Sequence, residues 1–408
     1  MVELIKHGVY LLDGQKVVED TTGMPSADEA RENTITYGIL RAHDVNGGKG
    51  KEMHIRFDAM MSHDITYVGI IQTARASGLT KFPLPYAMTN CHNSLCAVGG
   101  TINEDDHVFG LSAAKKYGGI YVPANQAVIH QFAREEMVKC GNMILGSDSH
   151  TRYGSLGNMG VGEGGGELVK QLLRNTWDIN APEVVLVWLE GTPRHGIGPH
   201  DVAISLVKAV FESGFVKNKV LEFAGPGVAN LSVDFRNGID VMTTETTCLS
   251  SIWVTDEKVR EHYELHRRPE DYKELRPGKV AYYDSMVRID LSKQESMIAL
   301  PYHPSNAVSI HELQADPETV LRRVEEDTKR EARSVLREPL DPVRLFHPLH
   351  HGFFHDGLDV RRTEKLALDG GRLCDPEFRV LREIFLPRDR ADPLEQFLES
   401  LCMETADL

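Results

Sequence analysis

The chain has 408 residues, of which 41% are hydrophobic and 26% are charged, and its formal net charge at pH 7 is −15. A chain of this length and composition can bury a core, and we expect a soluble globular protein of two or three domains. The acidic balance argues against binding of nucleic acid or of an anionic membrane surface through bulk electrostatics.

The apolar spacing of the first half predicts alternating strands and helices. In chain order they are a strand at 53–57, helices at 66–77 and 104–116, a strand at 119–122, a helix at 127–139, a strand at 142–145, a helix at 166–176 and a strand at 183–189. Such alternation is typical of a mainly parallel sheet with helices on both faces. The alternation of predicted strands and helices is interrupted at Gly191-Thr192-Pro193-Arg194, so we place a domain boundary after residue 190.

A second α/β unit is expected over residues 191–310. It begins with a helix at Pro199, continues with a strand at 220–223, and ends with apolar segments at 279–283 and 286–291. After Asp316-Pro317 a charged helix is expected to run to residue 337, and prolines, histidines and arginines then dominate the remaining residues. We therefore divide the chain into 1–190, 191–310 and 311–408.

The segment Gly146-Ser147-Asp148-Ser149-His150-Thr151 follows the strand predicted at 142–145 and is expected to lead into a helix. Ligands of open α/β sheets bind at the carboxyl ends of strands, so an acid, a hydroxyl and an imidazole on this turn are candidates for catalysis. The same residue types could instead serve only as helix N-caps.

Gly160, Gly162 and Gly165 spell GxGxxG, the loop that lets a backbone approach a dinucleotide pyrophosphate. That loop should follow a strand directly, whereas residues 151–159 lie between it and the predicted strand. Glu190, the first acidic residue at a later strand end, also lies beyond the usual spacing of about twenty residues. An NAD-dependent oxidoreductase is therefore only an alternative.

The Asp148 to Thr151 turn with its glycine-rich continuation resembles the signature of the aconitase and isopropylmalate-dehydratase family of iron-sulfur hydro-lyases. The resemblance covers roughly residues 33 to 310, in the order of the family's first two domains. It implies aconitase-like α/β/α domains with mainly parallel sheets and an incomplete third domain. It also implies a hydro-lyase that acts on a small hydroxy-carboxylic acid through a [4Fe-4S] cluster.

Dehydration needs an acid that protonates the departing hydroxyl and a base that takes a proton from the neighbouring carbon. By resemblance, Asp148, Ser149 and His150 match the family's active-site turn. His130, followed by Gln131, matches a His-Gln helix motif that supplies another active-site imidazole. A single histidine on an apolar helix is otherwise more often a core residue.

Three further positions depart from the family's pattern. His92 falls where the family has the histidine of an Asp-His pair that protonates the leaving hydroxyl, which makes it a catalytic candidate by resemblance. Cys91 stands in place of the aspartate, and a thiol orients an imidazole poorly unless it is ionised. His63 falls where the family has a glutamine that contacts substrate, and Asp240 where it has a glutamate near the cluster. These differences indicate either a divergent substrate or relaxed selection.

The cysteine motifs that hold the family's cluster, a Gly-Ser-Cys-Thr-Asn-Ser-like loop and a CxxC pair, do not occur in the sequence. The six cysteines are scattered and are expected to be reduced thiols in a reducing compartment. They are Cys91, Cys96, Cys140, Cys248, Cys374 and Cys402. No metal ligand is therefore assigned to this chain, and a partner chain is expected to supply the missing domains, unless the sequence is an incomplete gene product.

The tail and the N-terminus give weaker signals. Four histidines of the tail could bind a metal: His347, His350, His351 and His355. Pro348, however, interrupts their helical spacing. The tail either replaces the third domain or is a solvated extension.

The N-terminus lacks a signal or transit peptide and no run reaches transmembrane length, so we expect a cytoplasmic protein. A non-catalytic remnant with an anion site between Asp148 and Gly166 is the main alternative to an enzyme.

Overall fold

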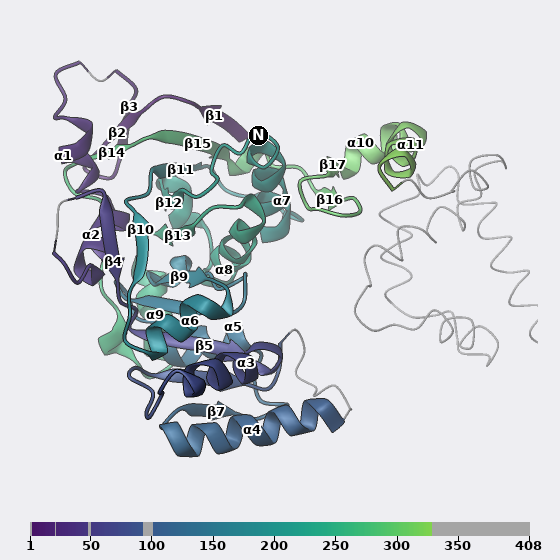
Figure 1. Ribbon diagram of the computed structural model, residues 1–408. Helices are drawn as coiled ribbons and strands as arrows, with labels where there is room; N and C mark the ends of the chain where they lie inside the picture. The colour runs from purple at the N-terminus through teal and green to yellow at the C-terminus, as the bar shows by residue number, and fades with distance from the viewer. Residues whose placement is uncertain (1, 21, 48–49, 93–100, 329–408) are drawn as a thin grey trace, which may run out of the picture. The chain divides into compact units, whose positions relative to one another are not determined.

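The computed structural model describes residues 2–20, 22–47, 50–92 and 101–328 (Figure 1). It contains two compact units, Met1–Met297 and Ile298–Leu408. The first unit is built on two five-stranded sheets, one entirely parallel and one mostly parallel, which confirms the expected α/β fold. Among the described residues no helix combines the length and the apolar character needed to cross a membrane.

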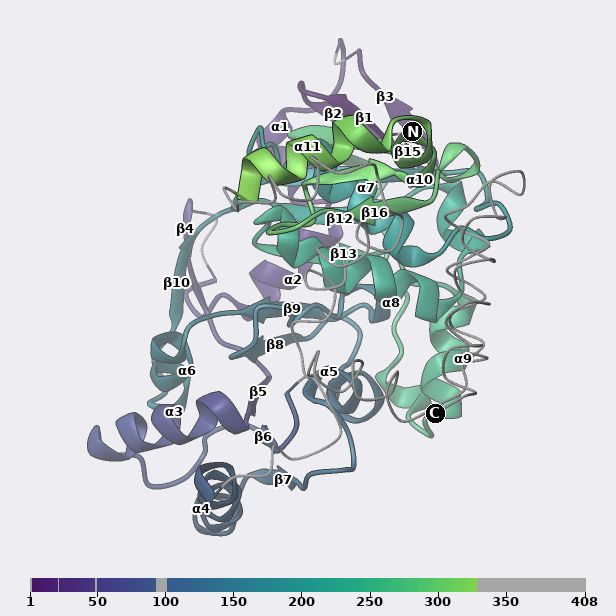
Figure 2. The ribbon, with the colours of Figure 1, turned by 90° about the vertical axis from the view of Figure 1, so that its right-hand side faces the viewer.

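The first sheet has the strand order β7-β6-β5-β8-β9, and all neighbouring strands run parallel. Helix α3 packs against α4 and α6, while α5 lies on the other side of the sheet (Figure 2). The strands and helices of this layer are β5 (Ala59–His63), α3 (Asp64–Ala76), β6 (Tyr86–Thr89), α4 (Thr101–Tyr117), β7 (Ile120–Val122), α5 (Ile129–Phe132), β8 (Met143–Gly146), β9 (Met159–Gly162) and α6 (Gly165–Leu172).

The second sheet has the order β1-β15-β11-β12-β13, in which only β1 is antiparallel to its neighbour. The strand expected at 183–189 is β11, which lies in the middle of this second sheet. The division of the chain after residue 190 stays a prediction. The elements are β1 (Val2–Ile5), β11 (Val184–Glu190), α7 (Pro199–Val210), β12 (Val220–Ala224), α8 (Val233–Met242), β13 (Ser250–Trp253), α9 (Glu257–Leu265) and β15 (Ser285–Asp290).

Smaller elements complete the first unit. The strand expected at 53–57 is β4, which pairs antiparallel with β10 and belongs to neither large sheet. A three-stranded sheet, β14-β2-β3, is also antiparallel. These elements are β2 (Val9–Leu12), β3 (Lys16–Val18), α1 (Ala27–Arg31), α2 (Ile35–His43), β4 (Glu52–Ile55), β10 (Trp177–Asn180) and β14 (Val280–Tyr283), with the 3-10 turns η2 (Gly154–Leu156) and η4 (Thr243–Thr246).

The helix expected at 127–139 divides into two parts. Helix α5 ends at Phe132, and one π-helical turn, Ala133–Met137, continues from it. A π-helical turn of this kind often lies at a functional site. The strands β5, β6 and β9 were not predicted.

Helix α2 is fixed to the second sheet by a buried carboxylate. Glu222 in β12 is fully buried and accepts hydrogen bonds from the backbone N–H groups of Ile35 and Thr36, at 3.1 and 2.9 Å, and from the Tyr283 hydroxyl at 2.7 Å. The first N–H groups of a helix have no partner within the helix, so this carboxylate and the N-cap side chain of Thr34 stabilise its start.

In the second unit, the described residues form a strand pair and two helices around a small core. The Ser309 hydroxyl caps α10 by accepting from the Glu312 N–H, and the Glu312 carboxylate accepts from the Ser309 N–H, which is a capping box. The expected charged helix is α11 as far as Thr328, and its predicted continuation lies outside the described residues. The elements are β16 (Met297–Ala299), β17 (Ala307–Ser309), α10 (Ile310–Ala315) and α11 (Pro317–Thr328).

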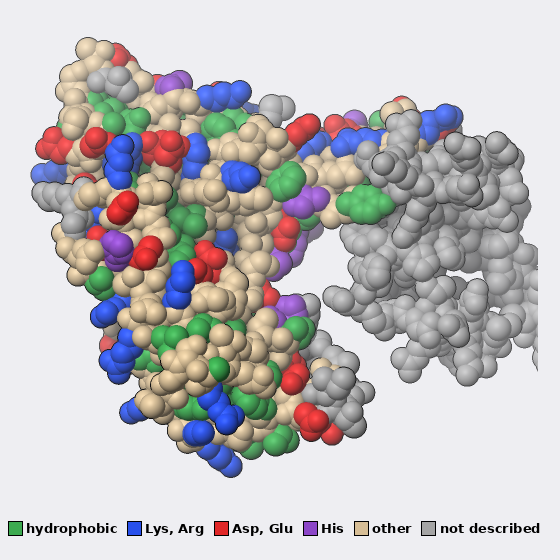
Figure 3. Space-filling view, in the orientation of Figure 1, with side chains coloured by type: hydrophobic (Ala, Val, Ile, Leu, Met, Phe, Trp, Pro, Cys, Tyr) green, Lys and Arg blue, Asp and Glu red, His purple; other side chains and the backbone are tan. Residues whose placement is uncertain are grey.

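Over the first unit, lysine and arginine side chains are interspersed with aspartate and glutamate on the face shown in Figure 3. A protein that binds nucleic acid through bulk electrostatics would present a continuous basic surface. The mixed charges on this face agree with the acidic composition. The absence of a nucleic-acid partner stays a prediction.

At the end of α2, His43 forms an ion pair that makes stability depend on pH. Its Nε2 lies 2.7 Å from Asp58 Oδ2 and its Nδ1 lies 2.8 Å from the Ile39 carbonyl oxygen, so both ring nitrogens face acceptors, as an imidazolium requires. Burial lowers the pKa of His43, but the hydrogen bonds to Asp58 and Ile39 outweigh burial and leave this pKa raised. The stabilisation is therefore complete below the unfolded pKa of about 6.5 and is lost as pH rises through the folded pKa.

We expect His43→Gln to lower the free energy of unfolding by about 1 kcal/mol at slightly acidic pH and by less at alkaline pH. Urea denaturation of both proteins at several pH values measures the difference. His54→Gln is the matched control, because His54 also pairs with an aspartate, Asp178, but at an exposed position. A His43→Gln effect that grows with rising pH would contradict the assignment.

Candidate active site

The Asp148 turn begins directly after β8. The Thr151 N–H and hydroxyl both donate to the Asp148 carbonyl oxygen, at 3.1 and 2.7 Å, and the His150 N–H donates to Asp148 Oδ1 at 2.7 Å. The turn continues into a loop, η2 and β9 before α6 begins at Gly165. The expectation that it opens a helix, and with it the interpretation as an N-cap cluster, is therefore wrong, because the intervening residues form their own strand.

The glycines around the turn allow close packing of backbone on backbone. A Cβ atom on Gly162 would lie 2.4 Å from the Asp148 carbonyl oxygen, and one on Gly160 would lie 2.9 Å from the Thr151 carbonyl oxygen. Both glycines lie within β9, in the first sheet, whereas Glu190 ends β11 in the second sheet. The dinucleotide motif needs its glycines and acid in one βαβ unit, so the structure gives the NAD alternative no support.

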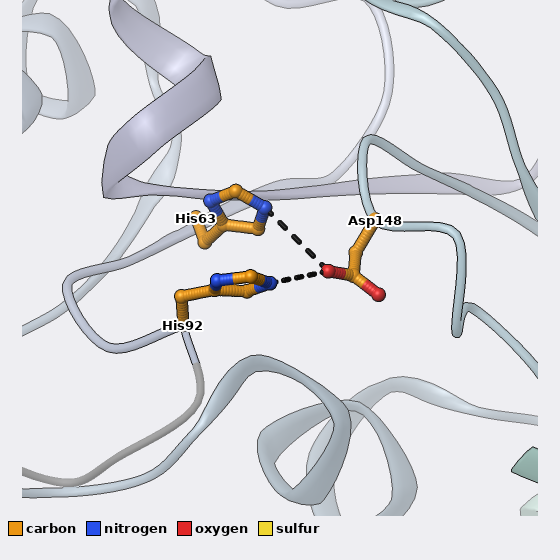
Figure 4. Close-up of side chains that lie close together, drawn as sticks. All are labelled: His63, His92 and Asp148. Atoms are coloured by element: carbon orange, nitrogen blue, oxygen red, sulfur yellow. Dashed lines mark hydrogen bonds and ion pairs between the residues drawn. The ribbon is translucent and has the colours of Figure 1, made fainter. Parts of the chain in front are cut away.

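Four imidazoles surround the carboxylate of Asp148. His92 Nε2 lies 2.6 Å and His63 Nε2 lies 3.6 Å from Oδ2, while His130 Nε2 lies 2.9 Å and His150 Nδ1 lies 3.6 Å from Oδ1. His63 ends β5, His92 follows β6 and Asp148 follows β8, so neighbouring parallel strands bring these three together (Figure 4). The structure thus gathers four of the residues expected at the site around the carboxylate of a fifth, Asp148.

Burial and charge set the protonation states of this group. Burial raises the pKa of Asp148, but the hydrogen bonds with His130 and His150 outweigh it and hold this pKa well below its usual range. The carboxylates of Asp148 and Glu245 raise the pKa of His150 to about 9. Burial and the neighbouring His92 ring lower the pKa of His63 to about 4. The group at neutral pH therefore combines an ionised carboxylate, a protonated His150 and a neutral His63.

Glu245 is a site residue that the sequence did not reveal. It lies in η4, and its Oε1 is 2.9 Å from His150 Nε2. The adjacent Thr244 hydroxyl donates to the Ser149 carbonyl oxygen at 2.6 Å, which joins η4 to the Asp148 turn. The Ser149 hydroxyl itself lies 3.3 Å from His150 Nδ1. Glu245 lies 95 residues after His150, and no sequence motif surrounds it. It is identified as a partner of His150 only because η4 packs on the Asp148 turn.

His130 belongs to the site rather than only to the core. Its Nε2 is bonded to Asp148 Oδ1, and its Nδ1 lies 3.1 Å from the Tyr153 hydroxyl. Both ring nitrogens therefore have partners, and the ring is fixed in one orientation. Burial outweighs the effect of Asp148 and lowers the pKa of His130.

Asp240, by contrast, is packed away from these imidazoles. It is fully buried in α8 and accepts hydrogen bonds from the Ser251 hydroxyl at 2.7 Å, the Trp253 indole N–H at 2.8 Å and the Ser155 N–H at 3.3 Å. Among the described residues these groups, and not the histidines, are its hydrogen-bond partners. A role for Asp240 in substrate binding stays a prediction.

A [4Fe-4S] cluster needs three cysteine thiolates that converge on one point. The described cysteines are Cys91, Cys140 and Cys248, and all three are buried. The Cys140 thiol donates to the Leu156 carbonyl oxygen and the Cys248 thiol to the Thr243 carbonyl oxygen, each at 3.3 Å. The described residues therefore do not fit the cluster that the resemblance implies.

Among the described residues, two histidines and an aspartate lie close enough together to hold a metal ion, and the sequence analysis did not predict this set. His63, His92 and Asp148 each offer an atom within 4.8 Å of the other two. The remaining cysteines and the tail histidines lie outside the described residues, and they are Cys96, Cys374, Cys402, His347, His350, His351 and His355.

Comparisons with known proteins identify the family of the chain. Residues 37–344 match the family model described as the aconitase family (aconitate hydratase). The chain is 26% identical over 286 residues to 3-isopropylmalate dehydratase large subunit 1 of Thermotoga maritima, which covers 69% of this chain and 68% of that protein. It is 28% identical over 313 residues to the mitochondrial aconitate hydratase of Aspergillus fumigatus, covering 71% of this chain and 40% of that protein.

A third relative is the 3-isopropylmalate dehydratase large subunit of Elusimicrobium minutum. It is 29% identical over 202 residues, covering 49% of this chain and 48% of that protein. The match thus spans between about two fifths and two thirds of the length of these three relatives.

Proposed function

Because the chain belongs to the aconitase family, we propose that it forms part of a hydro-lyase that acts on a small hydroxy-carboxylic acid. Its relatives are named as dehydratases and hydratases, which remove or add water. Two relatives are named as large subunits, and the matched region covers 68% and 48% of their length. We therefore also propose that a partner chain completes the enzyme.

The observation that carries the proposal is the position of the His150 ring between the carboxylates of Asp148 and Glu245, which raise its pKa to about 9. Hydroxide is a poor leaving group, so it must receive a proton as it departs. His150 Nε2 is committed to Glu245 at 2.9 Å, whereas the nearest partners of Nδ1, Ser149 Oγ and Asp148 Oδ1, lie 3.3 and 3.6 Å away. These are long hydrogen-bond distances, so the Nδ1 proton is the one available to a substrate hydroxyl.

The other residues of the site hold this acid in position. Asp148 Oδ1 accepts from the His150 N–H and lies beside its ring, while Glu245 holds the far side of the ring. His130 in turn orients the Asp148 carboxylate. In this proposal His150 touches substrate, and Glu245 and His130 are positioning residues. The partner chain supplies the base and the groups that bind the substrate carboxylates.

The alternative of an anion-binding remnant is disfavoured by the start of α6. Its N-cap, Gly164, is preceded by Glu163, and Glu167 lies in the first turn. Burial and the neighbouring Glu167 raise the pKa of Glu163, which is the effect expected where acidic side chains crowd together. Two acidic side chains beside a helix N-terminus disfavour the binding of an anion there by like-charge repulsion.

Turnover of a panel of hydroxy-dicarboxylic acids tests the proposal. The full chain is assayed with a co-expressed small subunit from a 3-isopropylmalate dehydratase and with its own co-purifying partner, and the ultraviolet absorbance of the conjugated double bond is followed. We expect dehydration of at least one acid and dependence on the partner. Failure of every acid in every combination would contradict the proposal.

A further inference from the structure

We propose that His63, His92 and Asp148 form a binding site for a single divalent transition-metal ion, such as Zn²⁺ or Fe²⁺. Two imidazole nitrogens and a carboxylate oxygen converge from three separate segments, within 4.8 Å of one another. Imidazole and carboxylate donors suit these ions, whereas Mg²⁺ and Ca²⁺ prefer sites built of oxygen ligands. The proposal concerns metal binding and does not depend on the hydro-lyase activity.

The three ligands lie where an open parallel sheet places its binding sites. His63 is the last residue of β5, His92 lies three residues beyond β6, and Asp148 lies two residues beyond β8. These strands are neighbours in the order β6-β5-β8, so their carboxyl ends meet at one edge (Figure 4). Rigid strands, rather than one flexible loop, therefore set the spacing of the set.

The two oxygens of Asp148 have different partners. Oδ1 accepts from the His150 N–H at 2.7 Å and lies 2.9 Å from His130 Nε2. These contacts orient the carboxylate in the way that outer-shell hydrogen bonds orient metal ligands. Within the described part of the chain, Oδ2 faces His92 and His63, at 2.6 and 3.6 Å, and is therefore the oxygen directed at the metal.

His63 has a buried ring without a hydrogen bond. The side chain is 5% exposed, and Nδ1 is enclosed and has no partner among the described residues. The nearest partner of Nε2 is Asp148 Oδ2, at 3.6 Å, which is too long for a hydrogen bond. Buried polar groups are normally paired, and a metal ion would give Nε2 a partner, while Nδ1 stays without one among the described residues.

The spacing of the ligand atoms fits one ion. Neighbouring ligands of a tetrahedral zinc ion at about 2.0 to 2.2 Å are about 3.3 to 3.5 Å apart. His63 Nε2 and Asp148 Oδ2 are 3.6 Å apart, which is close to this spacing. His92 Nε2 is hydrogen-bonded to Asp148 Oδ2 at 2.6 Å, so these two atoms must move apart by less than about 1 Å to reach the same spacing. Three protein ligands would leave further positions open to water or substrate, as at catalytic metal sites.

Cobalt binding tests the proposal. The full chain, without an affinity tag, is stripped with a chelator and titrated with Co²⁺, and the visible absorption and the bound metal per chain are measured. We expect one ion per chain, with zinc competing for it. We expect His63→Ala and Asp148→Asn each to weaken binding at least about 100-fold, the upper end of what loss of an outer-shell partner costs. His54→Ala, which removes another histidine paired with an aspartate, should leave binding unchanged.

A second variant keeps the test decisive if the buried substitutions disturb folding. The His92 side chain is 28% exposed, so His92→Ala should fold, as circular dichroism will show, and should weaken binding to a similar extent. Unchanged cobalt affinity in a folded His92→Ala chain would overturn the proposal. So would intense near-ultraviolet bands of thiolate-to-cobalt charge transfer, because they would mean that cysteines bind the ion.

Discussion

His150→Ala is expected to lower hydro-lyase turnover by about a hundredfold or more, as the loss of an acid-base group typically does. The alanine removes the imidazole whose pKa is raised to about 9 and whose Nδ1 makes only long contacts, 3.3 Å to Ser149 Oγ and 3.6 Å to Asp148 Oδ1. The assay compares kcat for wild type and variant with the acid that supports turnover. The loss should appear in kcat, because proton transfer takes place in the transition state.

Comparison of Asp148→Asn with His150→Ala separates the two proposals. The Asp148→Asn variant should be impaired in both measurements. It should lower kcat by a similar factor, because an amide at this position cannot hold the charge of His150, and it should also weaken cobalt binding. His150→Ala should reduce turnover while leaving three metal ligands in place. His54→Ala is the control for both measurements, since His54 pairs with Asp178 outside the site. Unchanged turnover in His150→Ala would remove the Asp148 turn from the mechanism.

The sequence predicted most of the residues that the structure gathers around Asp148, and their roles stay predictions. The resemblance identified His92, His130, Asp148 and His150, and the structure places their imidazoles around one carboxylate. It did not suggest a metal site, because the ligating set includes His63, a position where the family has glutamine. Nor did it suggest Glu245, whose place depends on the packing of η4 against a turn about a hundred residues earlier.

The missed strands have local causes. Gly160 and Gly162 make β9 resemble a loop, since glycine is rare inside strands, yet the strand needs them to pass the Asp148 turn at close range. Strand β5 reads Ala-Met-Met-Ser-His and is buried throughout, so it shows neither alternation nor the β-branched residues that mark strands. The local sequence pattern cannot identify either strand, because tertiary packing makes these residues extended.

A buried ion pair joins helix α8 to the start of α9. Arg236 is fully buried, and its Nη1 and Nη2 donate to the two carboxylate oxygens of Asp256, at 2.9 and 2.6 Å. Nη2 also donates to the carbonyl oxygens of Val228 and Leu231. Asp256 in turn caps α9 by accepting from the Val259 N–H. One carboxylate therefore neutralises a buried charge and begins a helix.

Asp256→Asn is expected to lower the free energy of unfolding by about 3 to 5 kcal/mol, because it leaves the Arg236 charge buried without a counter-ion. Urea denaturation at neutral pH measures the loss. The matched control is Glu257→Gln, which removes an exposed ion pair with Arg260 at the start of the same helix and should cost less than about 1 kcal/mol.

The effect of Asp256→Asn should also depend on pH with a defined sign. Burial raises the pKa of Asp256, but the Arg236 guanidinium outweighs burial and leaves this pKa below its usual value. Ionised Asp256 therefore stabilises the fold at pH values above its unfolded pKa of about 3.9, and this stabilisation is lost as pH falls through the folded pKa. The difference between wild type and variant should shrink in acid. A difference that stays constant down to that pH range would mean that Asp256 acts through its capping hydrogen bond, which asparagine also makes, rather than through its charge.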